Sequence, residues 1–301
     1  MSHLTLRDST LNLQNLRIRV NSIKVFDHIN IETTDHKAIA KIVAETLSQN
    51  NDIMESLKTT QRLLKEYGFS VLEGFDFHSL APNTRKQFLL GIWQLLGDVT
   101  YTDEILKVAI WDIKPRKESL NQNKTISEVA WEACFHTDTQ YYPNPEKYFI
   151  LACDTPANDG GESWLIDWVK LVNDIKENDK LLYNKLLNLK FPFAVPSSFT
   201  RSWTDNSIEI YLAPIIQEDK EPLLRFREDT IERWSKLIPS LYWQQHQEAF
   251  DQIKKYLNQD YRLLRFDLER NQILIVNNHE LLHWRWHFTD MNRLLYRVRM
   301  N

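Results

Sequence analysis

The chain has 301 residues, of which 43% are hydrophobic and 26% are charged, as in an ordinary soluble globular protein. Its formal net charge of -4 gives no electrostatic reason to expect a nucleic acid or an anionic membrane as the main partner. The six glycines are too few and too scattered to form the glycine-rich motifs that cradle phosphates in dinucleotide-binding and P-loop proteins. Any catalysis must therefore use side chains, a metal, or a cofactor held in another way.

The chain has only two cysteines, Cys134 and Cys153, which cannot build a disulfide framework and which fit a reducing compartment. The N-terminus has no apolar segment of the kind that a secretory signal needs. No apolar run approaches the length of a membrane-spanning helix. We therefore expect a cytoplasmic protein with no membrane partner. The sequence does not determine the oligomeric state, and it allows a homo-oligomer.

The first hundred residues are predicted to be mostly helical. Apolar side chains recur at helical spacing over 36–48 and 56–67, and an amphipathic helix is expected over 84–97. A short strand over 69–72 separates the second helix from the third.

From residue 108 onward the pattern changes to short apolar strands, with helices over 168–189, in two stretches, and over 240–258. The strands are expected over 108–113, 147–153, 163–167, 190–195, 207–212, 222–227, 261–268, 272–276 and 294–300. Many short strands after a helical beginning favour a sandwich or a jelly roll with helices outside.

Two histidine-containing patterns offer metal ligands. His136 and Asp138 form an H-x-D pattern, and on a strand two such side chains face the same side. His279 and His283 formally match the zinc-protease pattern H-E-x-x-H, with Glu280 as the base. That pattern requires a helix, but an apolar strand precedes it, and no Glu or Cys follows His283 as a third ligand. We therefore take His279 to be an ordinary polar side chain at a strand end.

Two further patterns could bind carboxylates. Arg293, Arg297 and Arg299 are spaced so that a strand would place all three guanidinium groups on one face. Arginine binds a carboxylate through two parallel hydrogen bonds, although such a row can also be a solvated edge. Ser163 follows the turn Gly160-Gly161 and could offer its hydroxyl to the same ligand.

Together these patterns resemble the taurine/2,4-dichlorophenoxyacetate dioxygenase family, which includes butyrobetaine hydroxylase-like and clavaminate synthase-like enzymes. The run F-H-T-D-T-Q-Y-Y-P-N-P-E-K-Y, followed by G-G-E-S-W-L-I-D, lies within residues 135–167. The run N-N-H-E-L-L-H-W-R over 277–285 is similar to the family motif D-N-x-x-x-L-H-G-R, and Arg293-x-x-x-Arg297 is similar to its closing R-x-x-x-R. The resemblance covers about residues 56–300.

The resemblance implies a fold that is mainly β with flanking helices, on a double-stranded β-helix (jelly-roll, cupin-like) core. It implies one oxygenase domain over 1–301, in which a helical part (1–100) packs on the core (101–301). It also implies an enzyme that uses Fe(II), 2-oxoglutarate and O2, releases succinate and CO2, and hydroxylates or desaturates a small acid or an amino-acid-like metabolite.

The family roles transfer residue by residue. His136, Asp138 and His283 are then the iron ligands, Arg293 is the partner of the distal carboxylate of 2-oxoglutarate, and Ser163 contacts the same cosubstrate. Arg297 lies by the inner carboxylate of the cosubstrate or by an acid group of the substrate, and Arg299 is a second candidate for that acid group. The aromatic residues expected to wall the substrate pocket are Tyr141, Tyr142, Trp284 and Trp286.

The chain departs from the family pattern at two positions that bear on the site. Trp284 replaces the glycine next to the distal histidine, which is expected to reshape the pocket wall. Asn271 stands where the family has the glycine of a turn, and asparagine tolerates the left-handed conformation nearly as well. The alternatives to an oxygenase are a zinc metallopeptidase that uses His279, Glu280 and His283, and a non-catalytic jelly-roll binding protein.

Overall fold

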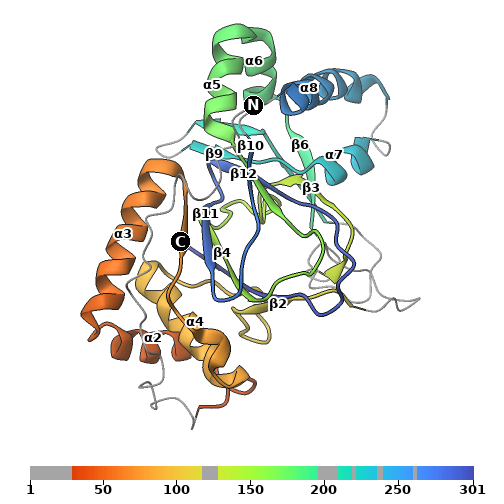
Figure 1. Ribbon diagram of the computed structural model, residues 1–301. Coiled ribbons are helices and arrows are strands. Elements are labelled where there is room, and N and C mark those ends of the chain that lie inside the picture. The colour runs from red at the N-terminus through yellow and green to blue at the C-terminus, as the bar shows by residue number, and fades with distance from the viewer. Residues whose placement is uncertain (1–28, 117–127, 196–208, 219–221, 236–239, 260–262) are drawn as a thin grey trace.

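The computed structural model describes residues 29–116, 128–195, 209–218, 222–235, 240–259 and 263–301 (Figure 1). Two antiparallel sheets form its centre, and helices cover their outer faces. The architecture is therefore mixed α/β, with the sheets at the centre and the helices outside. The expected strand starts at 207–208 and 261–262, and the first 28 residues of the predicted N-terminal part, lie outside the described residues.

The larger sheet has five strands in the order β1-β11-β4-β13-β2. Their bounds are β1 (Phe69–Leu72), β11 (Ile273–Asn277), β4 (Tyr148–Thr155), β13 (Leu294–Met300) and β2 (Trp111–Ile113). On β11, Ile273 and Ile275 face the helices, whereas Leu274 and Val276 face the second sheet. Burial on both faces explains the continuous apolar run of this strand.

The smaller sheet has four strands in the order β10-β5-β12-β3. Their bounds are β10 (Leu263–Phe266), β5 (Ser163–Asp167), β12 (Leu281–Arg285) and β3 (Ala133–His136). Leu165 and Leu281 pack with Phe149 and Leu274 of the larger sheet, so this apolar layer lies between the two sheets. In the register of the smaller sheet, His283 of β12 lies between Leu165 of β5 and His136 of β3.

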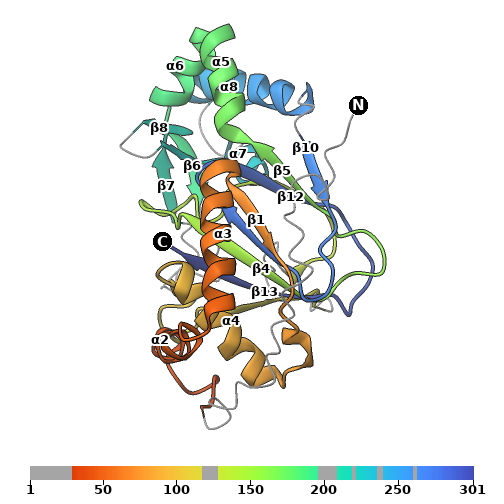
Figure 2. The same cartoon turned by 60° about the vertical axis from the view of Figure 1, so that its left-hand side comes forward.

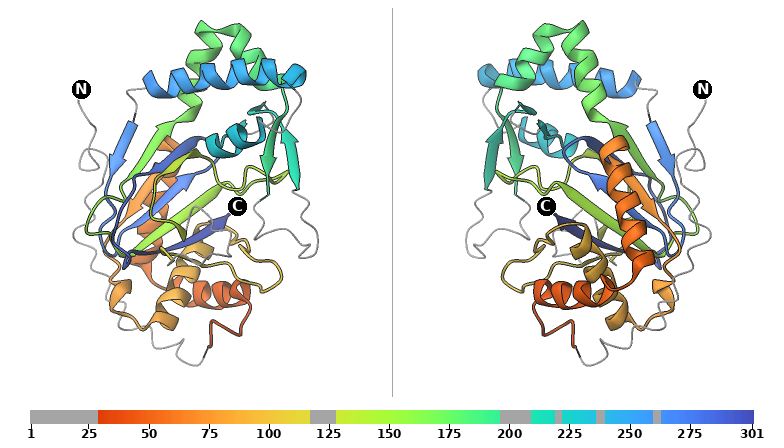
Figure 3. Two further views of the ribbon diagram at one scale, coloured as in Figure 1. Left: turned by 90° about the vertical axis from the view of Figure 1, so that its right-hand side faces the viewer. Right: turned by 90° about the vertical axis from the view of Figure 1, so that its left-hand side faces the viewer.

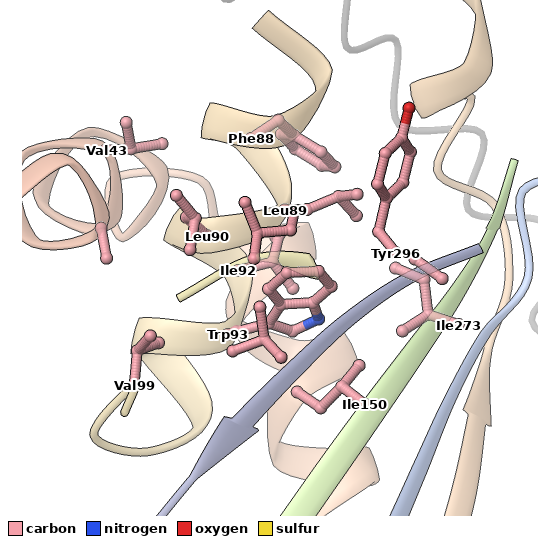
Figure 4. Close-up of a cluster of buried hydrophobic side chains, with 14 of the residues drawn as sticks. Val43, Phe88, Leu89, Leu90, Ile92, Trp93, Val99, Ile150, Ile273 and Tyr296 are labelled. Carbon is pink, nitrogen blue, oxygen red and sulfur yellow. The ribbon is translucent and has the colours of Figure 1, made fainter. Parts of the chain in front are cut away.

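Helices α2 (His36–Leu47), α3 (Asn51–Tyr67) and α4 (Pro82–Leu96) cover the outer face of the larger sheet, where Figure 2 shows α3 running along it. Helix α3 begins at Asn50, whose side chain accepts the backbone N–H groups of Asp52 and Ile53, and ends at Gly68 with φ 77°. Figure 4 shows Trp93 of α4 against the strands that carry Ile150 and Tyr296.

A second group of helices packs beyond the smaller sheet, at the end of the molecule opposite to α2 and α4 (Figure 3). Its members are α5 (Trp168–Asn178), α6 (Lys180–Asn188), α7 (Glu228–Ser235) and α8 (Ser240–Gln259). Two small hairpins complete this part: β6 (Phe191–Ala194) with β7 (Ile210–Ala213), and β8 (Ile216–Glu218) with β9 (Pro222–Leu224). Ile166 and Leu282 of the smaller sheet belong to the same apolar core as these helices.

Most elements agree with the sequence-based expectations, and five differences matter. Helix α3 begins at residue 51 rather than 56, and α4 begins at Pro82 rather than at 84. Strand β2 is shorter than the expected 108–113. Strand β12, which carries His283, was not predicted, and neither was α7. No helix among the described residues is both long and apolar enough to cross a membrane.

The close approach of α2 and α4 depends on Gly91, because a Cβ there would overlap the buried side chain of Val43. We expect Gly91→Ala to lower the free energy of unfolding by about 1–2 kcal/mol, since overpacking outweighs the gain in helix propensity. Urea denaturation measures this change. In a Val43→Ala background the same substitution should cost less, because the closest contact, with Cγ1, is removed while the contact with Cβ at 2.9 Å remains. An equal loss in both backgrounds would contradict the proposed clash.

Candidate active site

Three potential metal ligands converge between the two sheets. His136, Asp138 and His283 each offer one donor atom, and these atoms all lie within 4.8 Å of one another. The Nε2 atoms of both histidines are 3.7 Å from Oδ1 of Asp138. Among the residues that the structure describes, this is the one group of three or more such side chains close enough to hold a metal ion.

Strand pairing brings the two histidines together. His283 and His136 are direct partners across β12 and β3, and their ring centroids are 4.0 Å apart. The Nδ1 atom of His136 lies 2.7 Å from the carbonyl oxygen of Cys134 and donates to it, which leaves the Nε2 lone pair available as a ligand. Burial, together with His283 and Arg227, holds the pKa of His136 well below its ordinary value. The ring is therefore neutral, as a metal ligand must be.

Asp138 does not lie on the strand, as the H-x-D argument assumed. Strand β3 ends at His136, and Asp138 stands in a turn whose next residue, Thr139, has φ 52°. Burial alone would raise the pKa of Asp138, but Arg299, Arg297 and then His283 outweigh burial and hold it well below its ordinary value. The turn thus brings an ionised carboxylate to the histidines even though no strand alternation places it there.

A cavity between the sheets opens onto this group. Its charged and polar lining comes from His136, Asp138, Ser163, His283, Arg285, Arg293 and Arg297, and its remaining lining from Ile113, Ala133, Phe149, Leu151, Leu165, Leu274, Trp284 and Leu295. Cationic side chains outnumber the single carboxylate in this lining. The cavity therefore suits a ligand that carries negative charge at its ends and an apolar chain between them.

Arg293 is a buried cation with an unused donor. It is 5% exposed, and its Nη1 atom has no hydrogen-bond partner. Its guanidinium lies 4.9 Å from the ring centroid of Phe288, and burial lowers its pKa to about 10. A buried guanidinium with unsatisfied donors calls for an anion.

Arg297 is in a similar state, because its Nε atom has no hydrogen-bond partner and burial, followed by Arg299, lowers its pKa to about 10. Among the described residues it forms one ion pair, a longer one of 3.4 Å from Nη1 to Oδ2 of Asp138. Arg297 therefore has a donor left for a ligand that binds beside Asp138. Arg285, in contrast, donates to the carbonyl oxygens of Val129 and Trp131.

The turn before β5 shapes the site around Arg293. Gly160 and Gly161 have φ values of 62° and 80°, and a Cβ on Gly161 would lie 3.2 Å from Nε of Arg293. Ser163 follows this turn and lines the cavity. Glycine is thus required both by the backbone conformation and by the space that the guanidinium occupies.

The four expected aromatic residues are not all at the cavity. Trp284 lines it and packs against Trp164 and Trp286, with ring centroids 5.2 and 5.1 Å away. Trp286 is partly exposed outside the lining. Tyr141 is buried and Tyr142 half-exposed, and they contact each other outside the lining.

The zinc-protease pattern does not form its helix. His279 and Glu280 lie in the turn between β11 and β12, and His283 lies on a strand. The Nε2 atom of His279 is 2.9 Å from the carbonyl oxygen of Pro145. His279 therefore does not share a potential metal site with His283, whose donor atom lies with those of His136 and Asp138 instead.

Sequence reasoning missed two residues of the site. Arg285 belongs to the quoted motif, but no role was assigned to it, and it lines the cavity. Asn278 was quoted in the same way, and its side chain accepts the backbone N–H of Asp138 at 2.6 Å. The Asn-Asn sequence before the distal histidine was the one signal that could have pointed to it.

Residues 35–299 match the family model described as taurine catabolism dioxygenase TauD, TfdA family. The chain belongs to this family, and it is an Fe(II)- and 2-oxoglutarate-dependent dioxygenase. No match was found among curated protein sequences.

Solved structures show the same fold at low sequence identity. A structure of asparagine oxygenase in complex with Fe(II), 2S,3S-3-hydroxyasparagine and succinate is 18% identical, covers 89% of this chain and 91% of its own, and has a TM-score of 0.63. A structure of the non-heme iron oxygenase OrfP with Fe, succinate and (3R,4R)-dihydroxy-L-Arg is 16% identical, covers 88% of this chain and 85% of its own, and has a TM-score of 0.66.

The Gly160-Gly161 turn gives a specific test of the arginine site. We expect Gly161→Ala to raise the KM for 2-oxoglutarate several-fold with a smaller change in kcat, because the new methyl group displaces Arg293. Steady-state kinetics with varied 2-oxoglutarate measure both constants. Gly74→Ala is the matched control, since Gly74 also has a positive φ, 91°, but does not line the cavity. Equal effects of the two substitutions would show that backbone strain alone is responsible.

Proposed function

We propose that His136, Asp138 and His283 bind one Fe(II) ion through two imidazole nitrogens and one carboxylate oxygen. The observation that carries this proposal is the convergence of three donor atoms within 4.8 Å at a cavity whose lining includes Arg293 and Arg297, each with one buried guanidinium nitrogen that has no hydrogen-bond partner. Two histidines and one carboxylate are the ligand set of non-haem Fe(II) oxygenases. The site fits the metal, because His136 is neutral and Asp138 is ionised.

We further propose that Arg293 and Ser163 hold the distal carboxylate of 2-oxoglutarate. Arg297 is assigned to its inner carboxylate or to an acid group of the substrate. The unsatisfied Nη1 of Arg293 and Nε of Arg297 support both assignments, since each needs an anionic acceptor. The leucines of the lining suit the methylene groups between the two carboxylates.

When bound, Fe(II) and 2-oxoglutarate supply the oxidising chemistry, in which O2 is consumed, succinate and CO2 are released, and a substrate C–H bond is oxidised. The protein's part is to hold the reactants and to exclude water. The carboxylate of Asp138 also favours hydroxylation or desaturation over halogenation, because related halogenases lack this ligand and use the vacated space for chloride.

The substrate that we propose is an amino-acid-like metabolite or a small acid. The asparagine oxygenase and OrfP structures contain hydroxylated asparagine and hydroxylated arginine respectively, which supports this class. Trp284 and Arg297 line the cavity and are proposed to contact the substrate. Tyr141 and Trp286 lie outside the lining, and we assign them to the layer behind it.

We propose that the two facing antiparallel sheets form a double-stranded β-helix, or jelly-roll, core, and that residues 1–301 are one oxygenase domain. The contacts of α4 with β13 and the shared apolar core support the packing of the helical N-terminal part on this core. We also propose a cytoplasmic location, which the two free cysteines support.

Anaerobic addition of Fe(II) and 2-oxoglutarate should produce a weak visible charge-transfer band. His136→Ala and His283→Ala should abolish the band and reduce iron-dependent succinate formation by at least 100-fold, because each removes a proposed ligand. Glu280→Gln is the control and should keep both signals. The zinc metallopeptidase alternative predicts instead a peptidase activity that Glu280→Gln abolishes and Asp138→Ala retains. If the wild type forms no band and no succinate, the oxygenase proposal fails.

Arg293→Met should raise the KM for 2-oxoglutarate by at least 10-fold, because a charge-assisted contact worth roughly 1.5–3 kcal/mol is lost. The KM of Arg293→Lys should lie between those of the wild type and Arg293→Met, since lysine keeps the charge but not the planar fork. Separately, succinate release from a panel of amino acids and small acids identifies the substrate. A KM in Arg293→Met within twofold of the wild type would contradict the assignment.

A further inference from the structure

The two carboxylate oxygens of Asp138 lie in different surroundings. Oδ1 faces the Nε2 atoms of His136 and His283, each at 3.7 Å. Oδ2 points the other way, to Nε of Arg299 at 2.9 Å. One carboxylate oxygen thus faces the proposed metal position, and the other already accepts a hydrogen bond from the protein.

Arg299 is not available to a substrate, although the sequence suggested it as a partner for an acid group. It is 6% exposed, lies near the end of β13, and is paired in register with Phe149 of β4. Burial would lower its pKa, but Asp138 and then Glu146 more than compensate and raise it. Its charge is therefore balanced by two carboxylates of the protein.

The second carboxylate is itself held in place. Oε1 of Glu146 accepts a hydrogen bond from the hydroxyl of Thr100 at 3.2 Å, and Oε2 accepts one from the hydroxyl of Thr139 at 2.5 Å. Thr139 follows Asp138 and has the left-handed φ of 52°. Glu146, whose charge also favours the cationic form of Arg299, thus anchors the strained turn after Asp138.

The backbone of Asp138 is held independently by Asn278. The Asn278 side chain accepts the N–H of Asp138 at 2.6 Å and donates to its carbonyl oxygen at 2.9 Å. The main chain of Asp138 therefore keeps its place without Arg299, which acts on the carboxylate instead. Oδ2 has two cationic neighbours, Nε of Arg299 at 2.9 Å and Nη1 of Arg297 at 3.4 Å, and Arg299 makes the shorter contact and the hydrogen bond.

We propose that Arg299 is a positioning residue that restricts Asp138 to coordination through one oxygen. Oδ1 then faces the metal, and Oδ2 stays hydrogen-bonded to Arg299. The inference rests on the proposed iron site. A carboxylate can bind a metal through one or both oxygens, and three single-atom protein ligands leave the open positions that a chelating cosubstrate and O2 require. By holding Oδ2, Arg299 keeps Asp138 from occupying one of those positions, in the way that outer-shell partners orient metal ligands.

Co(II) is a suitable probe, because its visible d–d absorption reports coordination number without turnover. We expect Arg299→Met to weaken Co(II) binding by roughly 10–100-fold, as is typical for loss of an outer-shell partner, and to change the intensity of the d–d bands. Arg299→Lys should bind Co(II) with intermediate affinity, because it keeps the buried charge but loses the fixed guanidinium geometry. Arg62→Met, which removes an exposed arginine paired with Glu66 on α3, is the control and should match the wild type.

Thermal denaturation without metal identifies variants that fail to fold, and if Arg299→Met is one of them, Arg299→Lys decides the question. A folded variant whose Co(II) affinity lies within twofold of the wild type, with an unchanged spectrum, would overturn the inference. If the wild type itself binds neither Co(II) nor Fe(II), the proposed iron site fails, which is a different result from an unaltered Arg299 variant.

Discussion

The pairing of β12 with β3 is the constraint on which the rest of the site depends. It sets His283 directly opposite His136, so the distance between the two imidazoles is decided by backbone hydrogen bonds rather than by flexible loops. A shift of one residue in this register would turn His283 to the face occupied by Leu282, which packs in the outer apolar core. The two histidines are therefore as well fixed as the sheet itself.

Burial of charge is the second constraint. Arg285, Arg293 and Arg297 line a cavity that holds a single carboxylate, Asp138. The pKa of Arg285 is lowered to about 9 by burial and by Arg293, which records the free-energy cost of placing these cations together. A dianionic ligand offsets that cost and stabilises the folded protein by mass action. The apolar layers around the two sheets must maintain the site when no such ligand is bound.

The sequence predicted the parts of the site that depend on local pattern. The alternation over β13 and the turn at Asn271, which has φ 69° as expected of a residue in place of glycine, are both confirmed. Strand β12 was missed because Leu-Leu-His-Trp-Arg does not alternate cleanly: Leu281 faces the inner layer, Leu282 faces the outer core, and the polar residues line the cavity. The roles of Asn278 and Arg299 depend on contacts across 140 and 161 residues of sequence, which no local pattern encodes.

Strand β13 and the residue before it connect these observations, because their three arginines face the site and contact different groups. Arg293 precedes the strand and lines the cavity, Arg297 lines the cavity and also approaches Oδ2 of Asp138, and Arg299 donates to that same oxygen. The intervening residues Tyr296, Val298 and Met300 pack in the core beneath α4. Because one face of the strand is committed to the helices, the arginines cannot turn away from the site. The same apolar packing that secures the N-terminal helices therefore sets the order of charges along the cavity, from the cosubstrate end to the metal ligand.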